Sequence, residues 1–218
     1  MSVFSKLSQI SRSRKLTLFN EIMSPGKETK VLDVGAEVNP NDHKELQFID
    51  IYQWKNNLSA LNISAGHISA IKENYPEVKA IVCDACKLPW PDKSFDVVYS
   101  NAVIEHVGSF EKQKAMAGEI MRVGKRWFVT TPNRWFPFEF HMRLPFVTWL
   151  PGNGYLWIGR IVSYNHVQGK YRFGGKHNGL RLMSAHELRE CFPNSKIIKQ
   201  RVTIMAETLI AVGGDFTK

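Results

Sequence analysis

The first 133 residues alternate between two patterns of apolar and polar positions. Short, nearly all-apolar runs predict buried strands at 30–35, 58–63, 78–84, 95–100 and 126–131. Apolar residues spaced three or four positions apart predict helices at 7–23, 64–75 and 109–122. Strands that alternate with helices in this way are typical of a parallel sheet with helices packed on both faces.

The C-terminal region follows a different pattern. Ser184 and Glu187 form a capping box that predicts a helix ending before Pro193. Two β-rich runs, 196–204 and 207–212, then follow with no helical segment between them. Because parallel strands need a crossover, these two runs should form an antiparallel hairpin. The prediction is therefore an α/β fold with a doubly wound sheet of seven strands, six parallel and one antiparallel.

The stretch 134–181 differs from the rest of the chain in charge and aromatic content. It carries seven basic residues, one acidic residue and 11 of the 25 aromatic residues, in a chain of net charge +9. A basic, aromatic insert indicates a surface for acidic or amphipathic partners, including a peripheral membrane contact, or else a small second core. Nucleic acid is not expected as a partner, because it would need a broader basic face.

We treat the chain as one domain spanning residues 1–218, which is long enough for a full core. Within it, residues 1–27 are interpreted as an N-terminal helical arm and residues 134–181 as a lid or substrate-binding insert. No apolar run approaches the length of a membrane span, and the N-terminus lacks the apolar core of a secretion signal, so a cytoplasmic protein is expected. Cys83 and Cys86 have no second cysteine pair, so no metal site is expected.

Polar and small residues follow the predicted parallel strands where each one ends. The carboxyl ends of such strands meet at one edge of the sheet, where α/β proteins bind ligands. The candidates at this edge are Gly35, Asn62, Asp84, Asn101, His106 and Asn133. Glycine, amide and carboxylate groups suit a ligand that carries a nucleoside. A glycine-rich turn leading into a helix, which a phosphate-bearing dinucleotide would prefer, is missing.

Two segments carry a resemblance to a known family. VLDVG at 31–35 and DACKLPWPDKSFDVVYSNAVIEHV at 84–107 are similar to successive motifs of class I S-adenosylmethionine-dependent methyltransferases of the type 11 group. The resemblance implies a Rossmann-like sheet and S-adenosylmethionine as cofactor. Carried over by position, it implies a set of cofactor-binding residues: Asp33, Gly35, Ala36, Asn62, Asp84, Ala85 and Asn101.

The chain departs from the family pattern at two of these positions. The family's turn repeats glycine, whereas here Gly35 is followed by Ala36-Glu37-Val38. The position that holds the ribose hydroxyls is Asn62 rather than an acidic residue, and losing a charge-assisted hydrogen bond weakens affinity on the order of tenfold. Asp50 is an alternative ribose ligand if the second strand falls earlier in the chain. We favour Asn62, because the residues around it look like a strand leading into a helix.

Histidines are the candidates for proton transfer. An oxygen acceptor usually needs a base near its proton, and His106 and His141 are our predicted catalytic residues. We expect Asn133, Arg134, Trp135 and His177 to contact the acceptor. The predicted function is methyl transfer from S-adenosylmethionine, with O-methylation of a small-molecule, glycan or lipid-linked acceptor. The alternative is a non-catalytic binding protein with the same fold and a degenerate cofactor turn.

Overall fold

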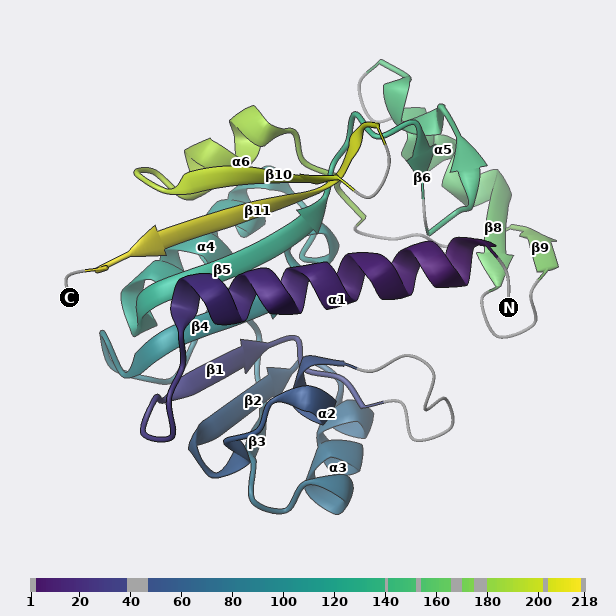
Figure 1. The fold of residues 1–218 in the computed structure, drawn as a ribbon. Helices are drawn as coiled ribbons and strands as arrows, with labels where there is room; N and C mark the ends of the chain where they lie inside the picture. The colour runs from purple at the N-terminus through teal and green to yellow at the C-terminus, as the bar shows by residue number, and fades with distance from the viewer. Residues whose placement is uncertain are drawn as a thin grey trace.

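The computed structural model describes residues 3–38, 47–139, 141–151, 154–165, 170–174, 180–201 and 204–216. Seven strands form one sheet in the order β10-β11-β5-β4-β1-β2-β3 (Figure 1). Their bounds are β1 Val31–Val34, β2 Leu58–Asn62, β3 Lys79–Val82, β4 Phe95–Asn101, β5 Gly124–Pro132, β10 Lys196–Arg201 and β11 Ala206–Gly214. Strand β11 runs antiparallel to both of its neighbours, and the other pairs are parallel. The predicted sheet of six parallel strands and one antiparallel strand is confirmed.

Helices cover both faces of this sheet (Figure 1). The bounds of the helices packed on it are α1 Val3–Met23, α2 Phe48–Ile51, α3 Ala65–Asn74, α4 Phe110–Val123 and α6 Ala185–Cys191. Helices α1, α2 and α3 bury residues in one hydrophobic cluster, and α4 and α6 bury residues in another. In β1, Leu32 and Val34 point to the second cluster and Val31 to the first, as the alternation of a strand requires.

The segment interpreted as an N-terminal arm contains α1, which packs along the sheet. Phe19 and Met23 are fully buried, and the Phe19 ring lies edge-on to Phe128 at a centroid distance of 5.6 Å. Further along α1, the Lys15 ammonium donates to the Asn101 side-chain carbonyl at 2.7 Å. Helix α1 thus contributes to the core and also reaches the carboxyl edge of the sheet.

The described residues of the stretch 134–181 form a layer beyond this edge, around a small core shared with Leu182. The described elements are β6 Phe138–Glu139, β7 Leu144–Pro145, η3 Val147–Trp149, α5 Gly154–Ile161, β8 Val162–Asn165 and β9 Lys170–Phe173. Their core consists of Met142, Tyr155, Leu180 and Leu182. The Tyr155 hydroxyl accepts from the Leu182 backbone N–H at 3.0 Å, and this bond ties α5 to the chain that returns to the sheet.

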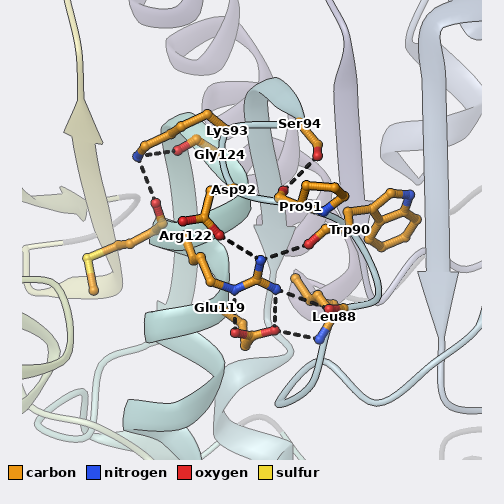
Figure 2. Close-up of polar contacts among 10 residues, drawn as sticks. Leu88, Trp90, Pro91, Asp92, Lys93, Ser94, Glu119, Arg122 and Gly124 are labelled. Carbon is orange, nitrogen blue, oxygen red and sulfur yellow. Dashed lines mark hydrogen bonds and ion pairs between the residues drawn. The ribbon is translucent and has the colours of Figure 1, made fainter.

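An arginine on α4 holds the loop between β3 and β4 in place (Figure 2). The Arg122 guanidinium forms a two-pronged pair with Glu119, both contacts at 2.8 Å, and donates to the Leu88 and Trp90 carbonyls. Glu119 also accepts from the Leu88 backbone N–H at 2.6 Å. Lys93 closes the far end of the loop by donating to the Met121 and Gly124 carbonyls. This clamp positions the segment that carries Asp84 and Ala85.

Predicted boundaries differ from observed ones by a few residues. The third strand ends at Val82 rather than at residue 84, because the chain turns there into the loop. The first helix begins at Val3, four residues earlier than its apolar spacing predicts. Among the described residues, no helix is both long enough and apolar enough to cross a membrane.

Candidate functional site

A cavity of about 420 Å³ opens at the carboxyl edge of β1, β2, β3 and β4. Four of the predicted cofactor-binding residues line it: Gly35, Asn62, Asp84 and Ala85. His106 lines the same cavity from η2 Ile104–His106, which follows β4. Pockets of 300–1,000 Å³ hold small molecules and cofactors, so this cavity has the size that an adenosyl group requires.

Gly35 makes the tight turn after β1. Its φ is +83°, and a Cβ built there would lie 2.2 Å from Val103 Cγ2. A side chain would therefore collide with the far wall of the cavity and would strain the backbone as well. The backbone N–H groups of Gly35 and Ala36 both donate to the Leu61 carbonyl, at 2.8 and 3.0 Å. One glycine is enough for this turn, because Ala36 points into the core with 3% of its surface exposed.

The side chain of Asn62 braces this same turn. Its amide Nδ2 donates to the Ala36 carbonyl at 2.9 Å, and its Oδ1 accepts from the Ser64 backbone N–H at 2.9 Å. An aspartate could not make the first of these bonds and would set a carboxylate against a carbonyl oxygen. The departure from the family's acidic residue therefore has a local cause. Asn62 lies at the end of β2, as we favoured over Asp50, whose two oxygens accept from Gln47 and Tyr75.

Asp84 begins the loop that forms another wall of the cavity. Its Oδ1 accepts from the Cys86 backbone N–H at 2.9 Å, while the residue itself is exposed. Ala85 is buried, with 7% of its surface exposed. Burial, followed by the charge of Asp84, raises the pKa of the Cys86 thiol to about 11, so this thiol is protonated at neutral pH. No reactive thiolate faces the cavity from Cys86.

Asn101 is not among the residues that line the cavity. Its carbonyl accepts from Lys15 at 2.7 Å and from the Thr130 hydroxyl at 2.8 Å, on the side that α1 covers. The next two residues, Ala102 and Val103, line the cavity instead. Ala102 has a φ of +57°, and this left-handed conformation turns the chain across the sheet edge.

Asp33 also lies away from the cavity, on β1. Only 4% of its surface is exposed, and burial together with the nearby Glu37 charge raises its pKa to about 8. Asp33 is therefore mostly protonated at neutral pH. On helix α1, burial and then the Arg12 charge lower the pKa of Lys15 to about 8.

The two predicted catalytic histidines lie against each other. The His106 and His141 rings meet edge to face with a centroid distance of 4.9 Å. His141 Nδ1 is 2.7 Å from Glu139 Oε1, and the Glu139 side chain is nearly completely buried. Burial acts to lower the pKa of His141, but the hydrogen bond and charge of Glu139 outweigh it, so the pKa lies above 6.5. The same pairing outweighs the effect of burial on Glu139 and lowers its pKa below 4.5.

Glu105 lies beneath this pair of histidines. It is fully buried, and its Oε2 accepts from the Thr131 hydroxyl at 3.0 Å. Its Oε1 has no hydrogen-bond partner among the residues that the structure describes. Burial raises the pKa of Glu105 to about 7, although the nearby His141 charge acts in the opposite direction. The cluster thus contains groups that can hold or release a proton close to neutral pH.

One group of described residues has the composition of a metal site. Glu105, His106 and His141 each offer a ligand atom, and these atoms lie within 4.8 Å of one another. Nitrogen and oxygen ligands about 2.0–2.1 Å from Zn²⁺ lie about 3.4 Å apart in a tetrahedral site.

The residues expected to contact the acceptor are placed differently. Asn133 braces the turn after β5: its side chain donates to the Ala206 carbonyl at 2.8 Å and accepts from the Trp135 backbone N–H at 3.1 Å. Arg134 lies over the Trp135 ring, with its guanidinium carbon 5.6 Å from the centroid. None of these three lines the cavity. His177 lies outside the described residues.

Sequence reasoning missed several residues of the cavity wall. These are Glu37, Leu61, Ile63, Cys83, Cys86, Ala102, Val103, Val107 and Lys112. From the sequence, Glu37 is named only as part of the broken glycine repeat, and Lys112 is assigned no role. Their spacing carries no signal of a site, since only the turn after β1 and the start of α4 bring them to the cavity.

Comparison with known proteins gives matches to parts of this chain. Residues 43–127 match the family model of the type 11 methyltransferase domain. Sterol 24-C-methyltransferase ERG6B of Gibberella zeae is 32% identical over 117 residues, which are 53% of this chain and 30% of that protein. A probable S-adenosylmethionine-dependent methyltransferase of Mycobacterium tuberculosis is 31% identical over 67 residues, 31% of this chain and 24% of that protein. The chain spans less than a third of the length of these curated relatives.

Solved structures with the same fold extend over nearly the whole chain. PH0226 protein from Pyrococcus horikoshii matches with a TM-score of 0.56 and 18% identity, over 93% of this chain and 89% of that one. A SAM-dependent methyltransferase from Aquifex aeolicus matches with a TM-score of 0.53 and 12% identity, over 95% and 96%. The resemblance to class I S-adenosylmethionine-dependent methyltransferases is confirmed. The sheet described above is the Rossmann-like fold of that family.

Proposed function

We propose that this chain is an S-adenosylmethionine-dependent methyltransferase that methylates a hydroxyl oxygen. The observation that carries the proposal is the cavity at the sheet edge, where Gly35, Asn62, Asp84 and Ala85 converge. Its volume and its glycine turn fit an adenosyl ligand, and the family match supports the cofactor. A solved structure with this fold, a Burkholderia thailandensis N1-methyltransferase, holds S-adenosylhomocysteine (TM-score 0.50, 13% identity).

The cofactor supplies a sulfonium methyl group, and the residues of this chain would hold the cofactor and the acceptor in place. Gly35 lets the tight turn after β1 form with Val103 packed directly against it, and Asn62 keeps the turn in that shape through the Ala36 carbonyl. Asp84 and Ala85 present the loop that the Arg122 clamp holds against α4. Positioning of this kind supplies much of the acceleration in a direct displacement.

O-methylation is favoured by the histidine pair. A hydroxyl group must lose its proton as the methyl group arrives, and His106 lies on the cavity wall where an imidazole can accept that proton. His141 packs against His106 and is itself held by the buried Glu139. We assign His106 as the catalytic base and His141, through Glu139, as the residue that positions it.

The acceptor class follows from the insert. Trp135, Phe146 and Trp149 lie exposed beyond the sheet edge, where they can stack on a ring or a lipid chain. The curated relative from Gibberella zeae is named for a sterol substrate. We therefore propose a hydroxyl-bearing small molecule or a glycan- or lipid-linked acceptor with substantial apolar surface.

Binding and transfer are tested separately. Calorimetry with S-adenosylmethionine and S-adenosylhomocysteine should give saturable heat, and each ligand should raise the melting temperature. Cofactor labelled in its methyl group is then incubated with the protein and with lipid or polar extracts, and the labelled product is treated with base to distinguish esters from ethers and amines. No heat and no thermal shift at millimolar ligand would refute the cofactor assignment.

The alternative, a non-catalytic binding protein, is favoured by the single glycine of the turn and by Asn62. It predicts that S-adenosylhomocysteine binds while no extract takes up label. The His106→Asn variant separates the two readings, because it should abolish labelling without changing the dissociation constant of the cofactor.

A further inference from the structure

The insert presents large apolar side chains to solvent. Five of them, which we call the aromatic face, are 38–65% exposed: Trp135, Phe146, Trp149, Leu150 and Trp157. Single exposed apolar residues are ordinary on a soluble protein, but a contiguous patch marks a contact surface. The aromatic face is therefore a candidate contact surface.

Direct contacts join three members of the aromatic face, Trp135, Phe146 and Trp149. The Trp149 indole N–H donates to the Trp135 carbonyl at 3.2 Å, and the Phe146 and Trp149 rings lie 5.0 Å apart. Leu150 packs against the start of α5, since a Cβ on Gly154 would lie 3.1 Å from Leu150 Cβ. The chain then continues along α5 to Trp157.

The exposure of these residues does not come from a lack of structure. Tyr155 and Trp157 lie two residues apart on α5, yet Tyr155 is fully buried in the insert core and Trp157 is 65% exposed. Helix α5 thus has one apolar side satisfied by its own core and another apolar side turned to solvent. A binding partner could cover that outer side while the core of the insert stays intact.

Charge narrows the identity of this partner. The only acidic residue of the stretch 134–181 is Glu139, which is 2% exposed and paired with His141. The β8–β9 hairpin alternates basic and aromatic residues, Lys170-Tyr171-Arg172-Phe173, and all four are exposed. The solvent-facing charge of the described insert residues is therefore positive only.

We propose that the aromatic face and the β8–β9 hairpin dock on the surface of an anionic lipid bilayer. Tryptophan and tyrosine suit the boundary between headgroups and acyl chains, and lysine and arginine reach the lipid phosphates. The absence of exposed acidic groups among the described insert residues favours a uniformly negative surface over a protein of mixed charge. This inference assigns to a bilayer three side chains that the proposed function places near an apolar acceptor, Trp135, Phe146 and Trp149, and its test needs neither cofactor nor acceptor.

Vesicle flotation tests the proposal with the intact chain and without cofactor. Vesicles of phosphatidylcholine alone are compared with vesicles in which about a third of the lipid is phosphatidylglycerol. Each basic group near an anionic surface adds about fivefold in partitioning, so the exposed Lys170 and Arg172 together give about a 25-fold preference for the anionic vesicles. High salt should remove most of this preference.

The variant Trp149→Ser/Trp157→Ser should partition at least about tenfold more weakly at low salt. The matched control is Phe216→Ser, which removes a 46% exposed aromatic residue just after β11. The C-terminal end of β11 lies at the opposite end of the sheet from the insert (Figure 1). The control should float like the wild type, and an unchanged melting temperature shows that each variant is folded.

Three results would overturn the inference. One is the absence of flotation with anionic vesicles. Another is flotation of the double variant at wild-type level, which would mean that the aromatic face is not the contact. The last is a dimer by light scattering that the double variant converts to a monomer, which would assign the face to a second copy of this chain.

Discussion

The sheet with its covering helices, which we call the cofactor half, and the insert at 134–181 differ in how much of their aromatic surface they bury. In the first, Phe19 and Phe128 are fully buried between α1 and the sheet. In the second, Tyr155 is buried but Trp149 and Trp157 are 47% and 65% exposed. The aromatic residues of the cofactor half are covered by the protein itself. The insert leaves Trp149 and Trp157 partly exposed, and the proposed bilayer contact would cover them.

The polar groups of the two regions differ in the same way. Around the cavity, Asn62 and Arg122 use their hydrogen bonds to hold backbone in place. Beyond the sheet edge, Glu139 and His141 pair with each other, and this pairing raises the pKa of His141 above 6.5 and lowers the pKa of Glu139 below 4.5. Asn62 and Arg122 thus fix the geometry of the cavity, whereas the groups that can carry a proton lie where His106, on η2 after β4, meets His141 of the insert. The following variants test that division.

The largest effect is expected for His106→Asn. If His106 accepts the acceptor's proton, methyl transfer should fall by about 10²- to 10⁴-fold while the dissociation constant of S-adenosylhomocysteine stays the same. Transfer is followed with methyl-labelled cofactor and affinity by calorimetry. The control is His186→Asn, an exposed histidine on α6 that pairs with Glu190. A transfer rate close to that of the wild type would remove His106 from the mechanism.

Gly35→Ala comes next and tests the fixed-geometry side. Its Cβ would lie 2.2 Å from Val103 at a φ of +83°, so cofactor affinity should drop about 10- to 100-fold, with a loss of stability above about 1 kcal/mol. Gly118→Ala on α4 is the matched control, because nothing lies within 4 Å of its Cβ. The control should gain about 0.5–1 kcal/mol. Equal behaviour of the two variants would show that the turn tolerates a side chain.

Asn62→Asp should destabilise the protein, although the family pattern has an acidic residue there. The change removes the donor to the Ala36 carbonyl inside a buried site, which costs about 1–3 kcal/mol. Chemical unfolding with and without S-adenosylmethionine measures this cost. Asn57→Asp, which loses a more exposed bond to the Lys27 carbonyl, should cost less. Tighter cofactor binding by the Asn62→Asp variant at unchanged stability would contradict the bracing role.

Glu139→Gln is expected to have the smallest effect and one that depends on pH. The raised pKa of His141 stabilises the fold below pH 6.5 and ceases to do so as the pH rises through the folded-state value. The lowered pKa of Glu139 contributes above pH 4.5 and is lost as the pH falls through its folded-state value. The wild type should therefore exceed the variant most between pH 4.5 and 6.5, by on the order of 1 kcal/mol for the pair.

Unfolding curves from pH 4 to 9 would follow that difference. Glu190→Gln, in the exposed pair with His186, serves as the control and should show little dependence on pH. A difference between wild type and Glu139→Gln that stays constant over the whole range would mean that the pair does not titrate as described.

Much of the fold and part of the site could be predicted from the sequence alone. The parallel strands and the helices between them follow from apolar runs of strand length separated by helical spacing, because burial on both faces of a parallel sheet leaves that pattern. Gly35, Asn62, Asp84 and His106 could be placed at one edge because each follows the end of a strand. Topology alone brings such positions together.

Only the tertiary structure decided how those positions are used. Asn101 follows a strand as Asp84 does, yet Lys15, from a helix 86 residues away, draws its side chain off the cavity. Asn62 braces a turn, and His141 meets His106 across the sheet edge. Periodicity sets the face on which a residue lies. The direction of its side chain depends on partners distant in sequence, as for Asn101 and Lys15, and such contacts produce no periodic pattern in the neighbouring residues.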